Sequence, residues 1–292
     1  MSNYQPIIKW SGSKRSQADE IIKYFPDKID TYYEPFCGGA SMMRRLLDSD
    51  IDVKHIVCSD LNKDLIETWK LIEGQPDRLL EKYTQFWTEL NSKETIDEKR
   101  KYFERKRFEY NMTHDPYIFF FIMRTCTNGM PRYNKKGEFN NSYHLSRGGI
   151  TPDNLRPIIE EWFKKLHSKD IEFVNCSYEK IFERCTENDF LYLDPPYMGV
   201  KKNQMYFGEI DFESFFNNLE QLNNKGIRYV LSFDGKSGEK DNTYNVPKNC
   251  YINHIYIKSG NSSFKRVIGN NKHAIVYESL YYNYDCNVIG LW

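Results

Sequence analysis

Residues 31–73 alternate between short β-prone runs and helical stretches, and this alternation leaves few folds open to the chain. The segment begins with the β-prone run TYYEPF, passes through a flexible CGG turn into ASMMRRLLD, and then reaches HIVCSD and LNKDLIETWKLIE. A strand that is followed by a helix and a second strand forms a βαβ unit, whose crossover makes the two strands parallel. The first third of the chain therefore predicts an α/β domain built on a parallel sheet.

The alternation stops in the middle of the chain and then resumes. Residues 75–165 are charged and aromatic, with helical patterns at DRLLEKYTQFWTEL and IDEKRKYFERKRFEYN, and become loop-rich over residues 125–149, where RYNKKGEF is typical of a β-hairpin. Strand-like runs return at IEFVNC, FLYLD, RYVLSF and HAIVYESLYY, with a helical FESFFNNLEQLNNKG among them. We predict a Rossmann-like, doubly wound α/β domain formed by residues 1–74 and 166–292. Residues 75–165 would be a mainly helical domain, with a β-hairpin, inserted into it.

Charge limits the possible partners only through its distribution. The 292 residues include 41 Lys and Arg and 41 Asp and Glu, so the net charge indicates no partner. Basic residues gather in the middle third, however. Residues 99–107 contain six of them against one glutamate, and residues 124–147 contain five against one. Such patches can contact phosphates even in a neutral protein, although a solvated helix or loop face would have the same composition.

The apolar and cysteine patterns bear on where the protein works. No stretch approaches the ~20 apolar residues that span a membrane, and the start of the chain lacks the apolar core of a signal peptide. The seven cysteines are scattered without a C-x-x-C pair, which argues against a disulfide framework and a zinc site. We expect a soluble, cytoplasmic protein with reduced cysteines, no metal site and no membrane contact.

The turn EPFCGGAS has features of a nucleoside-binding loop. Its glycines let a ligand approach the backbone, and the helix that follows offers free N–H groups. Asp60 ends the next predicted strand, where a carboxylate can accept hydrogen bonds from a ribose diol. The loop lacks G-x-G-x-x-G and a Walker lysine, and Glu34 would repel a pyrophosphate. These features favour S-adenosylmethionine, with its cationic sulfonium, over NAD; the alternative is an ordinary tight turn.

The stretch FLYLDPPYMG, residues 190–199, ends a β-prone run with an acid, two prolines and a tyrosine. Because proline has no backbone N–H, Pro195 and Pro196 end strand pairing and leave Asp194 at the strand's carboxyl end. The exocyclic amine of adenine is a poor nucleophile, since its lone pair is delocalised into the ring. Asp194 and the carbonyl of Pro195 could accept from its two N–H bonds, while Tyr197 stacks on the base. A base in a duplex must be flipped out to reach such a pocket.

These motifs together resemble those of the N6-adenine DNA methyltransferases of the α group, the D12 class related to the Dam methylases. IIKWSGSKR is similar to the family's amino-terminal motif, EPFCGGAS to its cofactor loop and SDLNKDLI to its ribose-binding strand end. LDPPY looks like the catalytic motif, RTCTNGMPRYNKKGEFN like the target-recognition hairpin and VYESLYYNY like the final strand. The resemblance covers nearly the whole chain. It implies a site-specific enzyme that transfers the methyl group of S-adenosylmethionine to N6 of a flipped adenine in double-stranded DNA.

The resemblance also implies roles for individual residues. Contacts to S-adenosylmethionine are implied for Trp10, Lys14, Phe36, Gly38 and Asp60. Asp194 is implied to bind both the target amine and the methionine end of the cofactor, within the catalytic set Asp194, Pro195, Pro196 and Tyr197. DNA contacts are implied for Lys9, Asn128, Met130, Arg132, Asn134, Lys135, Lys136, Ser142 and Tyr206. Of these, Arg132 could read a guanine through two hydrogen bonds, and the lysines beside the hairpin turn could contact phosphates.

The chain departs from the family's pattern in the recognition segment. Thr127 stands where GATC-specific members carry a tyrosine that enters the duplex, and Asn141 and Ser142 replace an apolar pair that touches a thymine methyl. The resemblance therefore implies methylation of adenine N6 but not recognition of GATC. Two alternatives stay open: a DNA-binding protein that has lost catalysis, and an amine or amide methyltransferase acting on RNA or protein. No obligate protein partner is expected.

Overall fold

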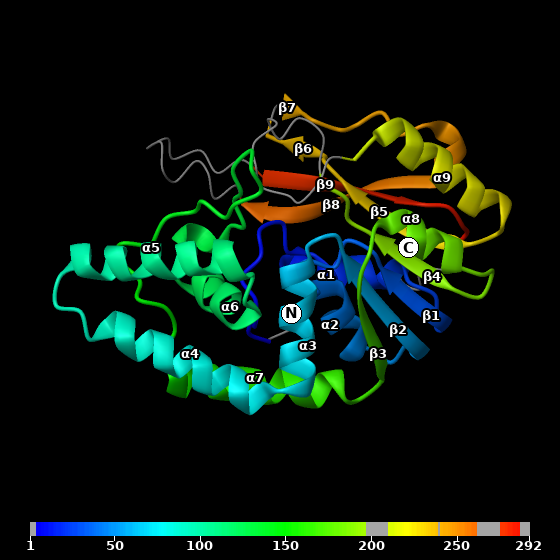
Figure 1. The fold of residues 1–292 in the computed structure, drawn as a ribbon. Helices are drawn as coiled ribbons and strands as arrows, with labels where there is room; N and C mark the ends of the chain where they lie inside the picture. Colours follow the sequence, from blue (N-terminus) through cyan, green and yellow to red (C-terminus); the bar gives the residue numbers. More distant parts are fainter. Residues whose placement is uncertain (1–3, 197–209, 239, 262–274, 287–292) are drawn as a thin grey trace.

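A computed structural model of the chain describes residues 4–196, 210–238, 240–261 and 275–286, and its core is a twisted sheet (Figure 1). The sheet order is β3-β2-β1-β4-β5-β9, and β8 pairs with β9 on the side away from β5. The first five strands are parallel, whereas β9 is antiparallel to both of its long neighbours. The long strands are β1 (Lys28–Glu34), β2 (Asp52–Asp60), β3 (Asp170–Asn175), β4 (Phe190–Leu193), β5 (Arg228–Phe233), β8 (Asn253–Asn261) and β9 (Ile275–Tyr282).

Helices cover both faces of this sheet, because the side chains of its central strands are buried on both sides. Tyr32 and Tyr192 point to one apolar cluster, with helices that include α2 and α3, while Tyr33 and Leu191 point to a second cluster with α8 and α9. Strands buried on both faces are near-continuous apolar runs, as FLYL is in β4. The predicted doubly wound α/β fold is thus confirmed. These helices are α1 (Ala18–Ile21), α2 (Ser41–Leu47), α3 (Lys63–Gly74), α8 (Tyr178–Arg184) and α9 (Phe212–Asn224).

Four helices of the middle segment gather at one end of the molecule, away from α9 (Figure 1). Two of them, α4 (Pro76–Asn91) and α5 (Ile96–Thr113), lie where the sequence predicted helices. The other two, α6 (Pro116–Thr125) and α7 (Pro152–Leu166), were not predicted. All but the first two residues of α6 are buried, so the helix has no polar stripe to mark its period; Asp115 caps its start.

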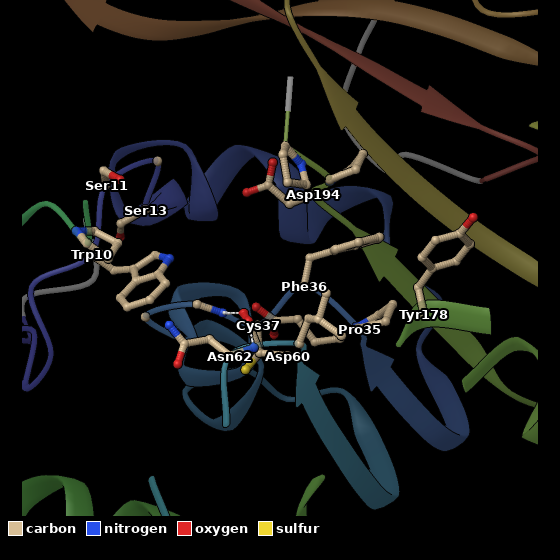
Figure 2. A pocket seen from close by; sticks show the side chains of 18 of the residues that line it. Trp10, Ser11, Ser13, Pro35, Phe36, Cys37, Asp60, Asn62, Tyr178 and Asp194 are labelled. Carbon is tan, nitrogen blue, oxygen red and sulfur yellow. Dashed lines mark hydrogen bonds between the residues drawn. The ribbon is translucent and has the colours of Figure 1, made fainter. Parts of the chain in front are cut away.

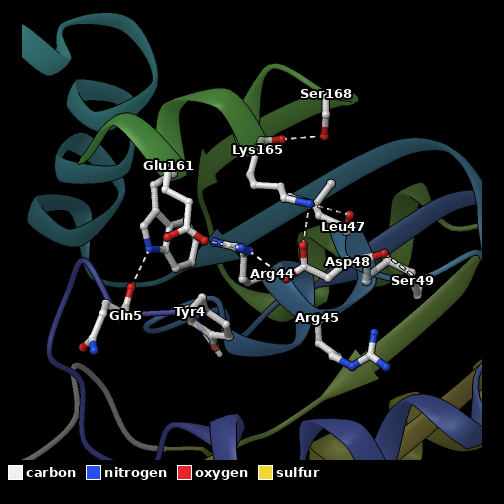
Figure 3. Close-up of polar contacts among 12 residues, drawn as sticks. Tyr4, Gln5, Arg44, Arg45, Leu47, Asp48, Ser49, Glu161, Lys165 and Ser168 are labelled. Carbon is white, nitrogen blue, oxygen red and sulfur yellow. Dashed lines mark hydrogen bonds and ion pairs between the residues drawn. The ribbon is translucent and has the colours of Figure 1, made fainter. Parts of the chain in front are cut away.

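Helix α7, at the end of the middle segment, packs against helices that cover the sheet; Figure 3 shows its polar contacts. Arg44 of α2 forms an ion pair with Glu161 at 2.7 Å, and Asp48 forms one with Lys165 at 2.5 Å. The indole of Trp162 packs on Trp69 of α3, with ring centroids 5.1 Å apart. The buried cluster on this face of the sheet consequently continues from the strands into α4–α7.

The predicted hairpin is present in a short form. Tyr133 and Phe139 form an antiparallel bridge, and the Asn134 N–H donates to the carbonyl of Glu138 at 2.8 Å. Gly137 closes the turn with a φ of +79°, a conformation that glycine adopts without strain. The remaining short elements are β6 (Lys236–Ser237), β7 (Lys240–Asp241) and the 3₁₀ turns η1 (Lys14–Ser16), η2 (Ile22–Tyr24), η3 (Thr127–Gly129) and η4 (Lys248–Cys250). Among the described residues, no helix is long and apolar enough to cross a membrane.

Candidate active site

A pocket lies at the carboxyl ends of β1, β2 and β4, where a doubly wound sheet places its ligands. Asp194 lies on one side of the cavity and Asp60 on the other, with Trp10 and Tyr178 at its flanks (Figure 2). Eight residues predicted from the sequence line this pocket: Trp10, Lys14, Phe36, Gly38, Asp60, Asp194, Pro195 and Pro196. They come from distant parts of the chain, and the fold brings them together.

The turn between β1 and α2 requires glycine at position 38. Gly38 has a φ of +47°, and a Cβ atom there would lie 2.6 Å from Cδ1 of Trp10. Its carbonyl accepts a hydrogen bond from the indole of Trp69 at 3.0 Å. The backbone of the turn is therefore pressed against the Trp10 ring on one side and held by α3 on the other.

Asp60 is fixed by backbone donors at the end of β2. One carboxylate oxygen accepts from the Gly38 N–H at 3.1 Å and the other from the Asn62 N–H at 2.9 Å. Burial raises the pKa of Asp60 to about 6, despite these hydrogen bonds. A carboxylate with two oxygens held in this way can still accept from a diol that enters the pocket.

Glu34 lies deeper, at the end of β1. It accepts from the Tyr32 hydroxyl at 2.9 Å and from the Met43 N–H at 2.7 Å. Burial raises its pKa to about 8, so the carboxyl is mostly protonated at pH 7. The expectation that a charged Glu34 repels a pyrophosphate is therefore not supported, because desolvation removes that charge.

Asp194 is paired with a buried lysine. The Lys14 ammonium lies 2.8 Å from one oxygen of Asp194 and 3.7 Å from Glu278 of β9. Burial disfavours the charge on Lys14, but the two carboxylates outweigh it and raise its pKa. Lys14 is thus charged at neutral pH, and its ammonium forms an ion pair with Asp194.

An aromatic wall completes the pocket. The ring of Phe36 lies 5.6 Å from that of Tyr178 and 6.2 Å from that of Phe215. Tyr178 follows β3, whose carboxyl end adjoins that of β2, and this position was missed in the sequence. Because a strand was predicted before it, the residues after IEFVNC could have been inferred as pocket residues. Asn62, Pro131 and Tyr133 also line the pocket and were missed as pocket residues, although Asn62 lies in the SDLNKDLI motif and the other two lie in the predicted hairpin segment.

The recognition residues predicted from the sequence lie on and around the hairpin. Arg132 is exposed, and its guanidinium donates to the side-chain and backbone oxygens of Asn140, both at 2.8 Å. The Asn134 carboxamide forms hydrogen bonds within the turn, to the Glu138 side chain and the Lys136 N–H. The side chains of Lys135 and Lys136 beside it are exposed. Ser142 is exposed and lies 3.2 Å from the Thr127 hydroxyl.

The turn before the hairpin is strained and tightly packed. Asn128 has a φ of +59° and is exposed, and Met130 follows at the end of the turn. Lys9 packs against it, since a Cβ atom on Gly129 would lie 2.5 Å from Cβ of Lys9. Asn141 is buried and donates to the carbonyls of Thr127 and Met130, both at 2.9 Å. Asn141 thus holds the turn instead of facing outward. Tyr197 and Tyr206 lie outside the described residues.

Comparison with known proteins identifies the family of this chain. Residues 10–275 match the family described as D12 class N6 adenine-specific DNA methyltransferase. The type II methyltransferase M.MjaIII of Methanocaldococcus jannaschii is 29% identical over 257 residues, covering 83% of this chain and 85% of the relative. The DNA adenine methylase of Haemophilus influenzae is 28% identical over 212 residues, covering 70% and 68%. Since the family match extends over most of the chain, this protein belongs to the D12 class of N6 adenine-specific DNA methyltransferases.

Proposed function

We propose that this chain transfers the methyl group of S-adenosylmethionine to N6 of an adenine that is flipped out of double-stranded DNA. The observation that carries the proposal is the position of Asp194. It ends β4, is bonded to Lys14 and shares one pocket with Asp60, the two acids lying on opposite sides of the cavity. One carboxylate is thus available for a ribose and the other for the reacting amine.

The residues of the pocket fit S-adenosylmethionine. Asp60 would accept from the ribose hydroxyls, and the Gly38 turn would let the nucleoside approach the backbone. Phe36 and Tyr178 offer aromatic faces to the adenine ring of the cofactor. The Ser11 hydroxyl lines the same pocket and is buried with no hydrogen-bond partner among the described residues. When bound, the cofactor supplies a methyl group already activated by a sulfonium.

The residues at the end of β4 would act on the target amine. Asp194 and the Pro195 carbonyl would accept from its two N–H bonds and localise the nitrogen lone pair. Asp194 forms an ion pair with the Lys14 ammonium, and a carboxylate has enough lone pairs to bind Lys14 and the amine together. Tyr197 follows directly in the sequence and would stack on the flipped base. The amine proton can leave to water after transfer.

We assign DNA recognition to the middle segment, residues 75–165, and methyl transfer to residues 1–74 and 166–292. The segment contains the basic residues of α5 and the hairpin with Arg132. Lys9 belongs to the catalytic part but packs against the recognition turn, so it would face the same DNA.

The test is methylation of plasmid DNA with S-adenosylmethionine, followed by single-molecule sequencing. The heat-denatured strands of the same DNA are tested in parallel as a single-stranded substrate. We expect N6-methyladenine in one sequence context, formed faster in duplex. Methylation of RNA or protein but not of DNA would indicate the amine or amide methyltransferase that is the alternative enzyme. Binding of cofactor and DNA without any methyl transfer would indicate a DNA-binding protein that has lost catalysis. Either result would overturn the proposal.

A further inference from the structure

The recognition hairpin supplies part of the wall of the cofactor pocket. Pro131 and Tyr133 flank Arg132 in the sequence, and both line the pocket that contains Asp60 and Asp194. Tyr133 is 5% exposed, and its hydroxyl accepts a hydrogen bond from the side-chain amide of Asn62 at 2.8 Å. The residue next to the predicted base-reading arginine is therefore a pocket residue.

Asn62 connects this hydroxyl to the predicted ribose site. Its backbone N–H donates to Asp60 at 2.9 Å, and the other oxygen of Asp60 accepts from Gly38. Its side-chain oxygen accepts from the Leu65 N–H at 3.1 Å and so caps α3. A continuous set of hydrogen bonds thus runs from the Gly38 turn through Asp60 and Asn62 to the hairpin.

The other side of Tyr133 is tied to the body of the hairpin. Its ring packs edge-on against Phe139, its partner across the hairpin, with centroids 5.8 Å apart. The Phe139 backbone exchanges two hydrogen bonds with the side chain of Asn111 on α5, at 2.8 and 3.1 Å. Tyr133 is therefore joined to Phe139 and, through it, to α5, so the Asn62–Tyr133 hydrogen bond connects the pocket to the body of the hairpin.

We propose that the Asn62–Tyr133 hydrogen bond couples cofactor binding to the placement of the recognition hairpin, so that each ligand strengthens binding of the other. Tyr133 and Asn62 are positioning residues in this scheme, and the inference rests on the proposed function. A ribose held by Asp60 restrains the Asn62 backbone, and the amide of Asn62 then holds Tyr133 and the adjacent Arg132 in the orientation that duplex DNA requires. Because coupling is reciprocal, bound duplex must also tighten the cofactor site.

The experiment measures the Kd of S-adenosylhomocysteine by calorimetry, with the protein free and saturated with a duplex. The duplex carries the sequence that single-molecule sequencing identifies as methylated. For the unaltered protein we expect about 5-fold or more tightening by duplex. Tyr133→Phe removes only the hydroxyl and should reduce this ratio roughly 2- to 10-fold, toward one. Asn62→Ser keeps a helix-capping oxygen but removes the amide donor, so it should reduce the ratio to a similar extent.

Two further variants separate coupling from general damage. Tyr143→Phe is the matched control, because Tyr143 is buried in the same segment against Phe103 and is absent from the pocket lining among the described residues. It should keep the wild-type ratio. The double variant Tyr133→Phe, Asn62→Ser should reduce the ratio no further than either single change, since each single change already breaks the Asn62–Tyr133 bond.

The outcomes distinguish this inference from the function on which it rests. A wild-type ratio of one, or a wild-type ratio retained in Tyr133→Phe, would overturn the coupling while leaving methylation intact. If the unaltered protein neither binds S-adenosylhomocysteine nor methylates adenine, the proposed function itself fails. A hairpin that is merely loosened would lose duplex affinity equally with and without the cofactor product, and the ratio would stay at its wild-type value.

Discussion

At the scale of single residues, the pocket is shaped by buried charges that are balanced within it. Lys14 lies between Asp194 and Glu278, and Glu278 is in turn held by Gln17 at 2.9 Å and Ser259 at 3.0 Å. An unpaired buried charge is costly, so each of these groups depends on the others. The position of the Asp194 carboxylate, for which we propose a catalytic role, is therefore set by residues on the N-terminal segment and on β9 together.

Replacing Asp194 should separate catalysis from folding. Asp194→Ala removes the acceptor that localises the amine lone pair, and losing one preorganised partner of this kind typically slows reaction by ~10²–10³. The measurement is transfer of labelled methyl groups to plasmid DNA. Glu187→Ala, at an exposed position before β4, serves as the control and should keep full activity. A turnover above a tenth of wild type in Asp194→Ala would remove this residue from the catalytic role.

Glu34 should make the stability of the protein depend on pH. Because its pKa is raised from 4.5 to about 8 in the folded state, its favourable contribution is fully present below pH 4.5 and is lost as the pH rises through about 8. Glu34→Gln removes this titration, so the variant should gain stability relative to wild type between pH 5 and 9, by an amount on the order of a few kcal/mol.

Urea unfolding across that pH range tests the expectation. Asp60 and Asp234, each with a pKa raised to about 6 by burial, remain in both proteins, so the difference between the two curves isolates Glu34. The exposed substitution Glu187→Gln should give a curve parallel to wild type. Parallel curves for Glu34→Gln as well would show that this carboxyl ionises normally.

At the scale of elements, the hairpin has two differently placed sets of side chains within eight residues. Tyr133 lines the pocket, whereas Arg132 and the two lysines at the turn are exposed. Side chains alternate between the two sides of a strand, which is why neighbours in sequence face pocket and solvent. Asn140 already holds the Arg132 guanidinium in a fixed orientation, which lowers the entropy lost on binding a base.

Substitutions in the hairpin should distinguish base reading from phosphate binding. Arg132→Ala should relax specificity at one base pair, with a loss of ~1–3 kcal/mol of discrimination. Removing Lys135 and Lys136 together should weaken binding to every sequence and reduce the slope of log K against log salt by roughly 2. Methylation rates on duplexes in which each position of the recognition sequence is varied in turn test the effect of Arg132→Ala. Titrations of DNA binding with salt test the effect of removing the two lysines. If Arg132→Ala slowed methylation of all duplexes by the same factor, Arg132 would contact the DNA backbone and not a base.

At the scale of the whole molecule, the middle segment with helices α4–α7 and the sheet share one apolar core. The stack of Phe173 on Trp69 and of Trp69 on Trp162 crosses from β3 through α3 to α7, with centroid distances of 5.4 and 5.1 Å. A continuous core makes partial unfolding costly, since separating the two parts would expose these rings. We therefore expect the chain to unfold in one transition.

Trp162 tests this expectation. Trp162→Ala removes a fully buried ring at the junction and should cost ~3–5 kcal/mol of unfolding free energy, in a transition that stays single. Lys164→Ala, exposed on the same helix, should change stability by less than about 0.5 kcal/mol. Urea unfolding followed by circular dichroism gives both values. Two separated transitions in the unaltered protein would contradict a shared core.

The sequence by itself determined the α/β fold, the family and eight of the residues that line the pocket. The end of a strand, such as the one before Pro195, is encoded by neighbouring residues and can be recognised in the sequence. Because the carboxyl ends of parallel strands meet at one edge of the sheet, Asp60 and Asp194 could be assigned to one site. Helices α4 and α5 were predictable from their composition and helical pattern. Helix α6 and strand β8 were not predicted: almost all of α6 is buried, and NHIYIKSGN is a run whose strand conformation depends on pairing with β9.

Only the tertiary structure decided which distant residues meet and which of them are charged. The bond between Tyr133 and Asn62 joins positions 71 residues apart, and the pair of Lys14 with Asp194 spans most of the chain. No local pattern encodes such contacts, because they depend on how the helices of the middle segment pack on the sheet. The raised pKa of Glu34 has the same origin, since burial, a property of the folded chain, removes the charge that the sequence shows.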